Sequence, residues 1–129
     1  MARETVQTDE APAAIGTYSQ AVVANGIAYL SGQIPLDPET GELVDGGIEV
    51  QIQRVFENLQ ALAKAAGMSL KDAVKLNVYL TDLGNFGHIN AIMMKYFDVP
   101  YPARAAVEVS ALPKGASVEI EAILVPDEE

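Results

Sequence analysis

Arg104 is the side chain whose type and position most clearly suggest chemistry. It follows a rigid, proline-containing segment at 100–103 and opens a stretch in which apolar and polar residues alternate. A guanidinium held firmly on a strand can bind a carboxylate through two parallel hydrogen bonds. The alternative is an internal ion pair with Glu108, Glu119 or Glu121. The spacing leaves both interpretations open, and the first predicts an anionic ligand.

Two carboxylates near the C-terminal end, Glu119 and Glu121, are the second candidate group. They share one face of a predicted strand, where burial or a like-charged neighbour can raise a carboxyl pKa and prepare the group for acid–base work. Ile123 and Val125 lie on that same face, so it is not wholly solvated. A solvated face is the simpler alternative.

Hydroxyl and amide groups stand at two predicted strand ends, in segments 18–20 and 31–33. Gly32 would let a ligand approach the backbone closely. Ser31 has no histidine or lysine base beside it, so hydrogen bonding to a ligand, or plain turn formation, is favoured over nucleophilic attack. Asn90 interrupts an apolar stretch, and capping, bridging and ligand contact are its three possible roles.

The composition excludes several classes of function. A chain of 129 residues predicts one domain spanning residues 1–129, and 8 Lys and Arg against 18 Asp and Glu give a net charge of −10. So few cations argue against nucleic acids and anionic membranes as partners. With no cysteine, one histidine (His88) and no phosphate-binding loop, we expect no metal and no cofactor. No apolar leader or membrane span is evident, which predicts a cytoplasmic protein.

Two stretches carry apolar residues at spacings of three and four, which predicts amphipathic helices over 48–63 and 86–97. Gly67 ends the first helix, and Pro100 and Pro102 close the second. The Phe and Met residues of these stretches are interpreted as core.

Strands are predicted where the pattern alternates or a turn signal stands between apolar runs. Asn25-Gly26 predicts a hairpin of 21–24 with 27–32, preceded by an extended arm with a short strand at most. Strict alternation predicts three more strands, over 71–81, 104–110 and 117–125; Val74, Leu76, Val78 and Leu80 are expected on one buried face. The order predicts a two-layer α+β domain, with two helices on one face of a mixed sheet.

With these residues in view, the chain resembles the RidA (reactive intermediate deaminase) family, also labelled L-PSP endoribonuclease. The similarity runs almost end to end, and the order and spacing of its segments make it specific. The segments that carry it include 11–16, 18–21, 31–35, 37–42, 96–97, 102–104, 107–109, 112–113 and 118–122.

The resemblance implies a chorismate-mutase-like fold and a homotrimer with sites at the subunit interfaces. It also implies a metal-free and cofactor-free hydrolase of the 2-iminobutanoate/2-iminopropanoate deaminase kind. Such enzymes convert reactive enamine and imine intermediates, such as 2-aminoacrylate, to 2-oxo acids and ammonia. An imine carbon is already electrophilic, so the chemistry needs only a fixed carboxylate, an oriented water and a proton shuttle.

The resemblance also assigns residues to roles. By position, Arg104 matches the arginine that grips the substrate carboxylate, and Glu119 matches the glutamate that positions or activates water. The remaining pocket contacts fall on Tyr18, Ser31, Gly32 and Asn90.

Three positions depart from the family pattern. Thr17 replaces a proline, and Met93 stands where a tyrosine is common. Ala106 stands where many members carry a cysteine, although the backbone amide there can still contact a substrate. The preferred imino acid therefore remains open.

Two other functions compete with deamination. The first is an endoribonuclease acting on single-stranded mRNA, which the net charge and the lack of a basic aromatic patch disfavour. The second is a non-enzymatic trimeric binder of small 2-oxo or amino acids, which the retained Glu119 disfavours.

Overall fold

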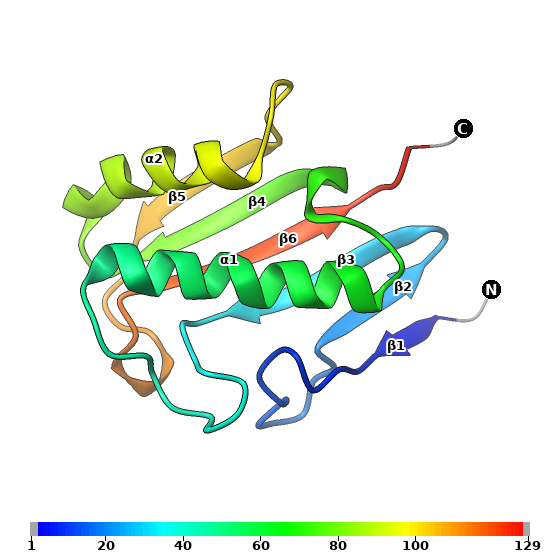
Figure 1. The fold of residues 1–129 in the computed structure, drawn as a ribbon, viewed down its shortest axis with the longest axis horizontal. Coiled ribbons are helices and arrows are strands. Elements are labelled where there is room, and N and C mark those ends of the chain that lie inside the picture. Colours follow the sequence, from blue (N-terminus) through cyan, green and yellow to red (C-terminus); the bar gives the residue numbers. More distant parts are fainter. Residues whose placement is uncertain (1–2, 128–129) are drawn as a thin grey trace.

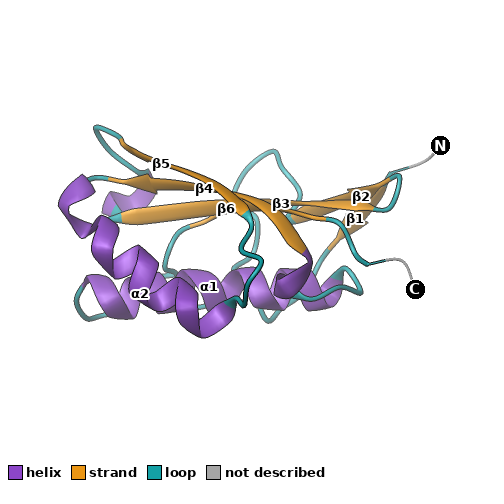
Figure 2. Cartoon of the chain, turned by 90° about the horizontal axis from the view of Figure 1, so that it is seen from above, coloured by secondary structure: helices purple, strands orange, loops and turns teal. Residues whose placement is uncertain are grey.

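The computed structural model describes residues 3–127, which form a six-stranded sheet with two helices on one face (Figure 1). Seen from above, the sheet and the helices make two layers (Figure 2). The predicted two-layer α+β class is confirmed. The elements are β1 (Glu4–Val6), β2 (Ala21–Ala24), β3 (Ile27–Gln33), α1 (Ile48–Ala65), β4 (Ala73–Leu80), α2 (Phe86–Tyr96), β5 (Ala103–Glu108) and β6 (Val118–Leu124).

The sheet is mixed and has the strand order β1-β2-β3-β6-β4-β5. Within residues 3–127, β4 and β5 form the one parallel pair, and the connection between them contains α2. The last strand, β6, lies in the middle of the sheet between β3 and β4, whereas β5 forms an edge. This topology puts Glu119 at the centre of the sheet and Arg104 on its rim.

The β2–β3 hairpin forms at the predicted Asn-Gly pair. Asn25 and Gly26 both have positive φ angles, 54° and 76°. These angles match the right-handed twist of the flanking strands, and an asparagine followed by glycine adopts them at little cost. The hairpin register therefore follows from the local sequence.

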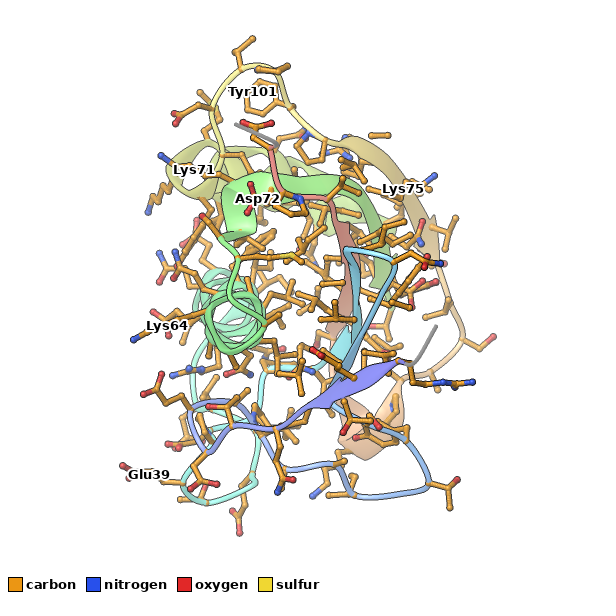
Figure 3. All side chains as sticks on the ribbon, turned by 90° about the vertical axis from the view of Figure 1, so that its right-hand side faces the viewer. Glu39, Lys64, Lys71, Asp72, Lys75 and Tyr101 are labelled. Atoms are coloured by element: carbon orange, nitrogen blue, oxygen red, sulfur yellow. The ribbon has the colours of Figure 1, made fainter. Side chains whose placement is uncertain are left out.

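The core lies between the sheet and the helices. The inward side of α1 carries residues such as Phe56 and Leu59, which are fully buried together with Leu76 and Ile120 of the central strands. Figure 3 shows the two outer surfaces, with Lys64 pointing away from α1 and Lys75 on the far side of the sheet. Within residues 3–127, neither helix is long and apolar enough to cross a membrane.

One residue of the alternating pattern is not on the predicted face. Val74 is 45% exposed, because the pairing of β4 with β6 shifts register between Ala73 and Lys75. A 3₁₀ turn at Leu70–Asp72 leads into this irregularity and replaces the predicted start of the strand. Such a bulge turns one side chain to the other face.

Candidate active site

Arg104 and Glu119 lie on opposite faces of the sheet. Arg104 is in register with Leu76, which is buried under the helices. Glu119 is in register with Tyr79, on the face away from the helices. Since side chains alternate along a strand, the two groups do not face each other within one chain. The predicted site residues therefore form two half-sites.

The first half-site is built around Arg104. Its Nη1 atom donates a hydrogen bond to Asn90 Oδ1 at 2.6 Å and lies 3.5 Å from Met93 Sδ. The guanidinium carbon is 4.7 Å from the centre of the Phe86 ring. These neighbours hold the charged group in place without neutralising it. Within residues 3–127, Arg104 forms no ion pair, so the alternative of an internal salt bridge is wrong.

One face of α2 provides this support. Phe86, Asn90 and Met93 follow one another at spacings of four and three, so they line up over β5. Asn90 thus bridges to Arg104 rather than capping the helix. The interpretation of Phe86 as a core residue is incomplete, because the Arg104 guanidinium also packs over its ring. Met94 is not core at all: it is 69% exposed.

An open cavity of about 440 Å³ lies beside Arg104. Its other walls are largely apolar and come from α2 and from the segment before β5. The lining residues are Asn90, Met93, Met94, Tyr101, Pro102 and Arg104. A small anion can enter this cavity and pair with the guanidinium, whereas the net charge of the chain would repel it elsewhere.

The second half-site is built around Glu119 and Gly32. The Glu119 carboxylate lies across Gly32: a Cβ atom added at that glycine would overlap Oε2 and lie 3.0 Å from Cδ. Any larger residue at this position would displace the Glu119 side chain from its observed place. A bulge between Leu30 and Gln33 places Ser31 and Gly32 opposite β6.

A second open cavity, of about 420 Å³, adjoins this pair. The predicted contacts Tyr18, Ser31 and Gly32 line it together with Glu119 and Glu121. The structure therefore groups the predicted residues as Tyr18, Ser31, Gly32 and Glu119 in one half-site, and Asn90 and Arg104 in the other.

Hydrogen bonds shape the wall of this second cavity. The Ser31 hydroxyl donates to the backbone oxygen of Ser19 at 2.6 Å, an arrangement suited to positioning rather than to nucleophilic attack. The buried Gln20 side chain donates to the carbonyl groups of Ala11 and Pro12 and so folds the N-terminal arm against the sheet. Gln20 is a residue whose supporting role the sequence pattern did not reveal.

Glu119 and Glu121 differ in their surroundings. Glu121 Oε2 accepts hydrogen bonds from Asn77 Nδ2 at 2.9 Å and from the Tyr79 hydroxyl at 3.2 Å. Glu119 accepts no side-chain hydrogen bond from the described residues. Partial burial, and next the charge of Glu121, raise the pKa of Glu119 above its ordinary value. Glu119 is thus a carboxylate with elevated basicity and free oxygens beside a cavity.

Ala106 is separated from both cavities. It follows Arg104 on the same face of β5, is in register with Val78 and packs against the core. Its side chain lines neither cavity. Over the part of the chain that the structure describes, no group of three His, Asp or Glu side chains is arranged to hold a metal ion.

The fold and the two half-sites define a small α+β domain with one surface suited to a carboxylate and another suited to proton transfer. A family model described as Endoribonuclease L-PSP matches residues 8–125. The chain therefore belongs to the endoribonuclease L-PSP (RidA) family, as the resemblance predicted.

Known relatives agree with this assignment over nearly the whole chain. A 2-iminobutanoate/2-iminopropanoate deaminase from Rattus norvegicus is 48% identical over 95% of this chain and 90% of its own. Among solved structures, RidA from Psychrobacter sp. PAMC 21119 is 56% identical, with a TM-score of 0.91 over 95% of this chain and 98% of its own. E. coli TdcF with bound serine is 40% identical, with a TM-score of 0.90 over 96% of this chain and 99% of its own.

Proposed function

We propose that the protein hydrolyses the C=N bond of small 2-imino acids, which arise from enamines such as 2-aminoacrylate, to 2-oxo acids and ammonia. The observation that carries this proposal is a guanidinium, Arg104, fixed by neighbours that leave its charge free beside a cavity. The deaminase name of the rat relative supports the reaction. The serine bound to E. coli TdcF supports a ligand with a carboxylate next to a nitrogen-bearing carbon.

The chemistry follows from the two groups. Arg104 binds the substrate carboxylate through two parallel hydrogen bonds and fixes the C=N carbon in position. Glu119 accepts a proton from water as the water oxygen bonds to that carbon, and the C=N π electrons move to nitrogen. Glu119 passes this proton to the nitrogen, which gives a neutral carbinolamine and restores the carboxylate. Glu119 then takes the hydroxyl proton of the carbinolamine and passes it to the nitrogen: the O–H electrons form the C=O bond, the C–N bond breaks, ammonia leaves, and Glu119 is ionised again.

A complete site requires a second copy of the chain. Arg104 lies at the sheet edge on the helix side, whereas Glu119 lies at the sheet centre on the open side. The open side also exposes apolar groups that a monomer would leave in water, including Tyr29 and Val107, each 46% exposed. A homotrimer with its sites between copies would cover this face and join Arg104 of one copy to Glu119 of the next.

RNA is the less favourable substrate for this chain, although the family carries the name endoribonuclease. Two carboxylates line the Glu119 cavity, and they would repel phosphates. Among the described residues, Arg104 is the one cation that lines the other cavity. Binding of nucleic acid normally relies on many Lys and Arg contacts.

The test generates 2-aminoacrylate in place with a serine dehydratase and follows the release of pyruvate. We expect the protein to accelerate this release and the Arg104→Ala variant to lose the acceleration. No acceleration by the wild-type protein would contradict the proposed reaction. If the protein then still bound a small 2-oxo or amino acid through its carboxylate, without turnover, a binding protein would be favoured.

A further inference from the structure

Glu121 lies beside the proposed chemistry but has no role in it so far. It lies two residues after Glu119 on β6, so both carboxylates project from the open face of the sheet. Two donors on β4, Asn77 Nδ2 and the Tyr79 hydroxyl, both bind its Oε2 atom. Two donors on one oxygen hold the carboxylate in one place. The position of the Glu121 carboxylate is therefore fixed by β4.

Among the residues that the structure describes, no Lys, Arg or His lines the cavity beside Glu119. β3 offers Ser31 and Gly32, neither of which ionises, and the N-terminal arm offers the Tyr18 phenol. β4 offers Tyr79, whose pKa is raised by burial and then by Glu121. Lys75 is the one cation on this strand, and within residues 3–127 it forms no ion pair with either carboxylate.

We propose that Glu121 is a positioning residue for the reaction: its carboxylate, held in place by Asn77 and Tyr79, sets the electrostatic surroundings in which Glu119 takes a proton from water. This role rests on the proposed function. The geometry carries it, because within residues 3–127 Glu121 accepts from two side-chain donors and Glu119 from none. The two carboxylates thus have different roles: Glu121 is held by two donors, and Glu119 exchanges a proton with water.

The proposal has a defined consequence for the pH dependence. The charge of Glu121 contributes to the raised pKa of Glu119, so its removal lowers that pKa. The reaction needs ionised Glu119 to accept the proton of water, so the rate falls on the acid side as Glu119 becomes protonated. Without the charge of Glu121 this acid limb moves to lower pH. The rate on the plateau falls as well, because a weaker base accepts a proton less readily.

Three variants separate this role from a structural one. Glu121→Gln removes the charge but keeps an oxygen that can accept from Asn77 and Tyr79. Glu121→Asp keeps the charge on a shorter side chain. Glu39→Gln is the matched control, since it removes one carboxylate from an exposed loop far from the sheet centre (Figure 3).

The first measurement follows the titration of the Glu119 carboxyl carbon by NMR, which does not depend on turnover. We expect Glu119 to titrate at lower pH in Glu121→Gln than in the wild type, and the control to leave it unchanged. We expect Glu121→Asp to restore most of the difference. An unshifted titration in Glu121→Gln would overturn the proposal.

The second measurement is the pH profile of imine hydrolysis, with the rate of substrate generation held constant. A shift of the acid limb in Glu121→Gln, without the same shift in Glu39→Gln, supports the proposal. An active wild type whose profile is not altered by Glu121→Gln overturns the role of Glu121 alone. A wild type that does not accelerate hydrolysis overturns the proposed function, and the role of Glu121 in catalysis with it.

Discussion

Replacement of Gly32 by alanine tests the Glu119 half-site with a single methyl group. That methyl would overlap Glu119 Oε2 and lie 3.0 Å from Cδ and 3.2 Å from Cγ. The backbone at Gly32 does not have a positive φ, so alanine itself brings no conformational strain. The flexible Glu119 side chain must therefore shift, and the change moves the carboxylate without removing it.

We expect the Gly32→Ala substitution to lower the catalytic rate much more than it lowers the free energy of unfolding. The displaced atoms are the end of a flexible side chain on the open face, so we expect a change in unfolding free energy within about 1 kcal/mol, as for surface substitutions. A positioned general base contributes roughly 10²–10⁴-fold to a rate. Its displacement corresponds to about 3–5 kcal/mol of lost transition-state stabilisation.

The assay compares pyruvate release from 2-aminoacrylate with thermal unfolding of the same preparation. Gly47→Ala is the matched control, because a methyl group there meets no atom within 4 Å. We expect Gly32→Ala to lose most of the acceleration and to unfold near the wild-type temperature. The control should keep its activity.

A double variant separates displacement of Glu119 from a direct obstruction of the substrate. If Gly32→Ala acts through Glu119, adding it to Glu119→Gln should cause little further loss, since the effects of coupled residues are not additive. Full activity of Gly32→Ala would refute the reasoning, and so would strictly additive losses.

Other substitutions should give the following results. Arg104→Lys should keep the charge but lose the paired hydrogen bonds, so KM for the imine rises by roughly tenfold or more. Phe86→Leu should weaken substrate binding by about 0.5–2 kcal/mol, measured as affinity for a 2-oxo acid product, since the guanidinium loses its aromatic support. Asn58→Ala should lower the unfolding free energy by about 1–3 kcal/mol in denaturant titrations, because the fully buried Asn58 side chain donates to the backbone oxygens of residues 34 and 36. Glu119→Gln should be more stable than the wild type at about pH 7, because ionisation of Glu119 is unfavourable in the fold. That gain should shrink as the pH falls through the raised pKa of Glu119 in the fold, and it should vanish below the pKa of Glu119 in the unfolded chain.

The fold could largely be predicted from the sequence because its signals are local. The Asn25-Gly26 turn, the spacing of α1 and the alternation of β6 each follow from backbone geometry that neighbouring residues dictate. The prediction that Val74 lies on the buried face is wrong, because the bulge there depends on pairing with β6, which is distant in the sequence. Strand order depends on such distant pairings as well, so it was not part of the expectation.

The candidate site was predictable in its residue types but not in its arrangement. Arg104 was evident as an isolated cation on a rigid strand, and Glu119 as part of an alternating pair. Phe86 was interpreted as core, because helical spacing cannot tell a ring that packs inward from one that supports a guanidinium. The division into two half-sites depends on strand registers, which place Arg104 and Glu119 on opposite faces.

The most direct test of the account mixes two inactive variants, Arg104→Ala and Glu119→Gln, after reversible dissociation of the subunits. If each site takes its arginine from one copy and its glutamate from another, random reassembly at equal amounts leaves about a quarter of the sites with both groups intact. We therefore predict recovery of about a quarter of the wild-type deaminase activity. A mixture that stays as inactive as its components, although mixed oligomers have formed, would contradict the claim that Arg104 and Glu119 act together across two chains.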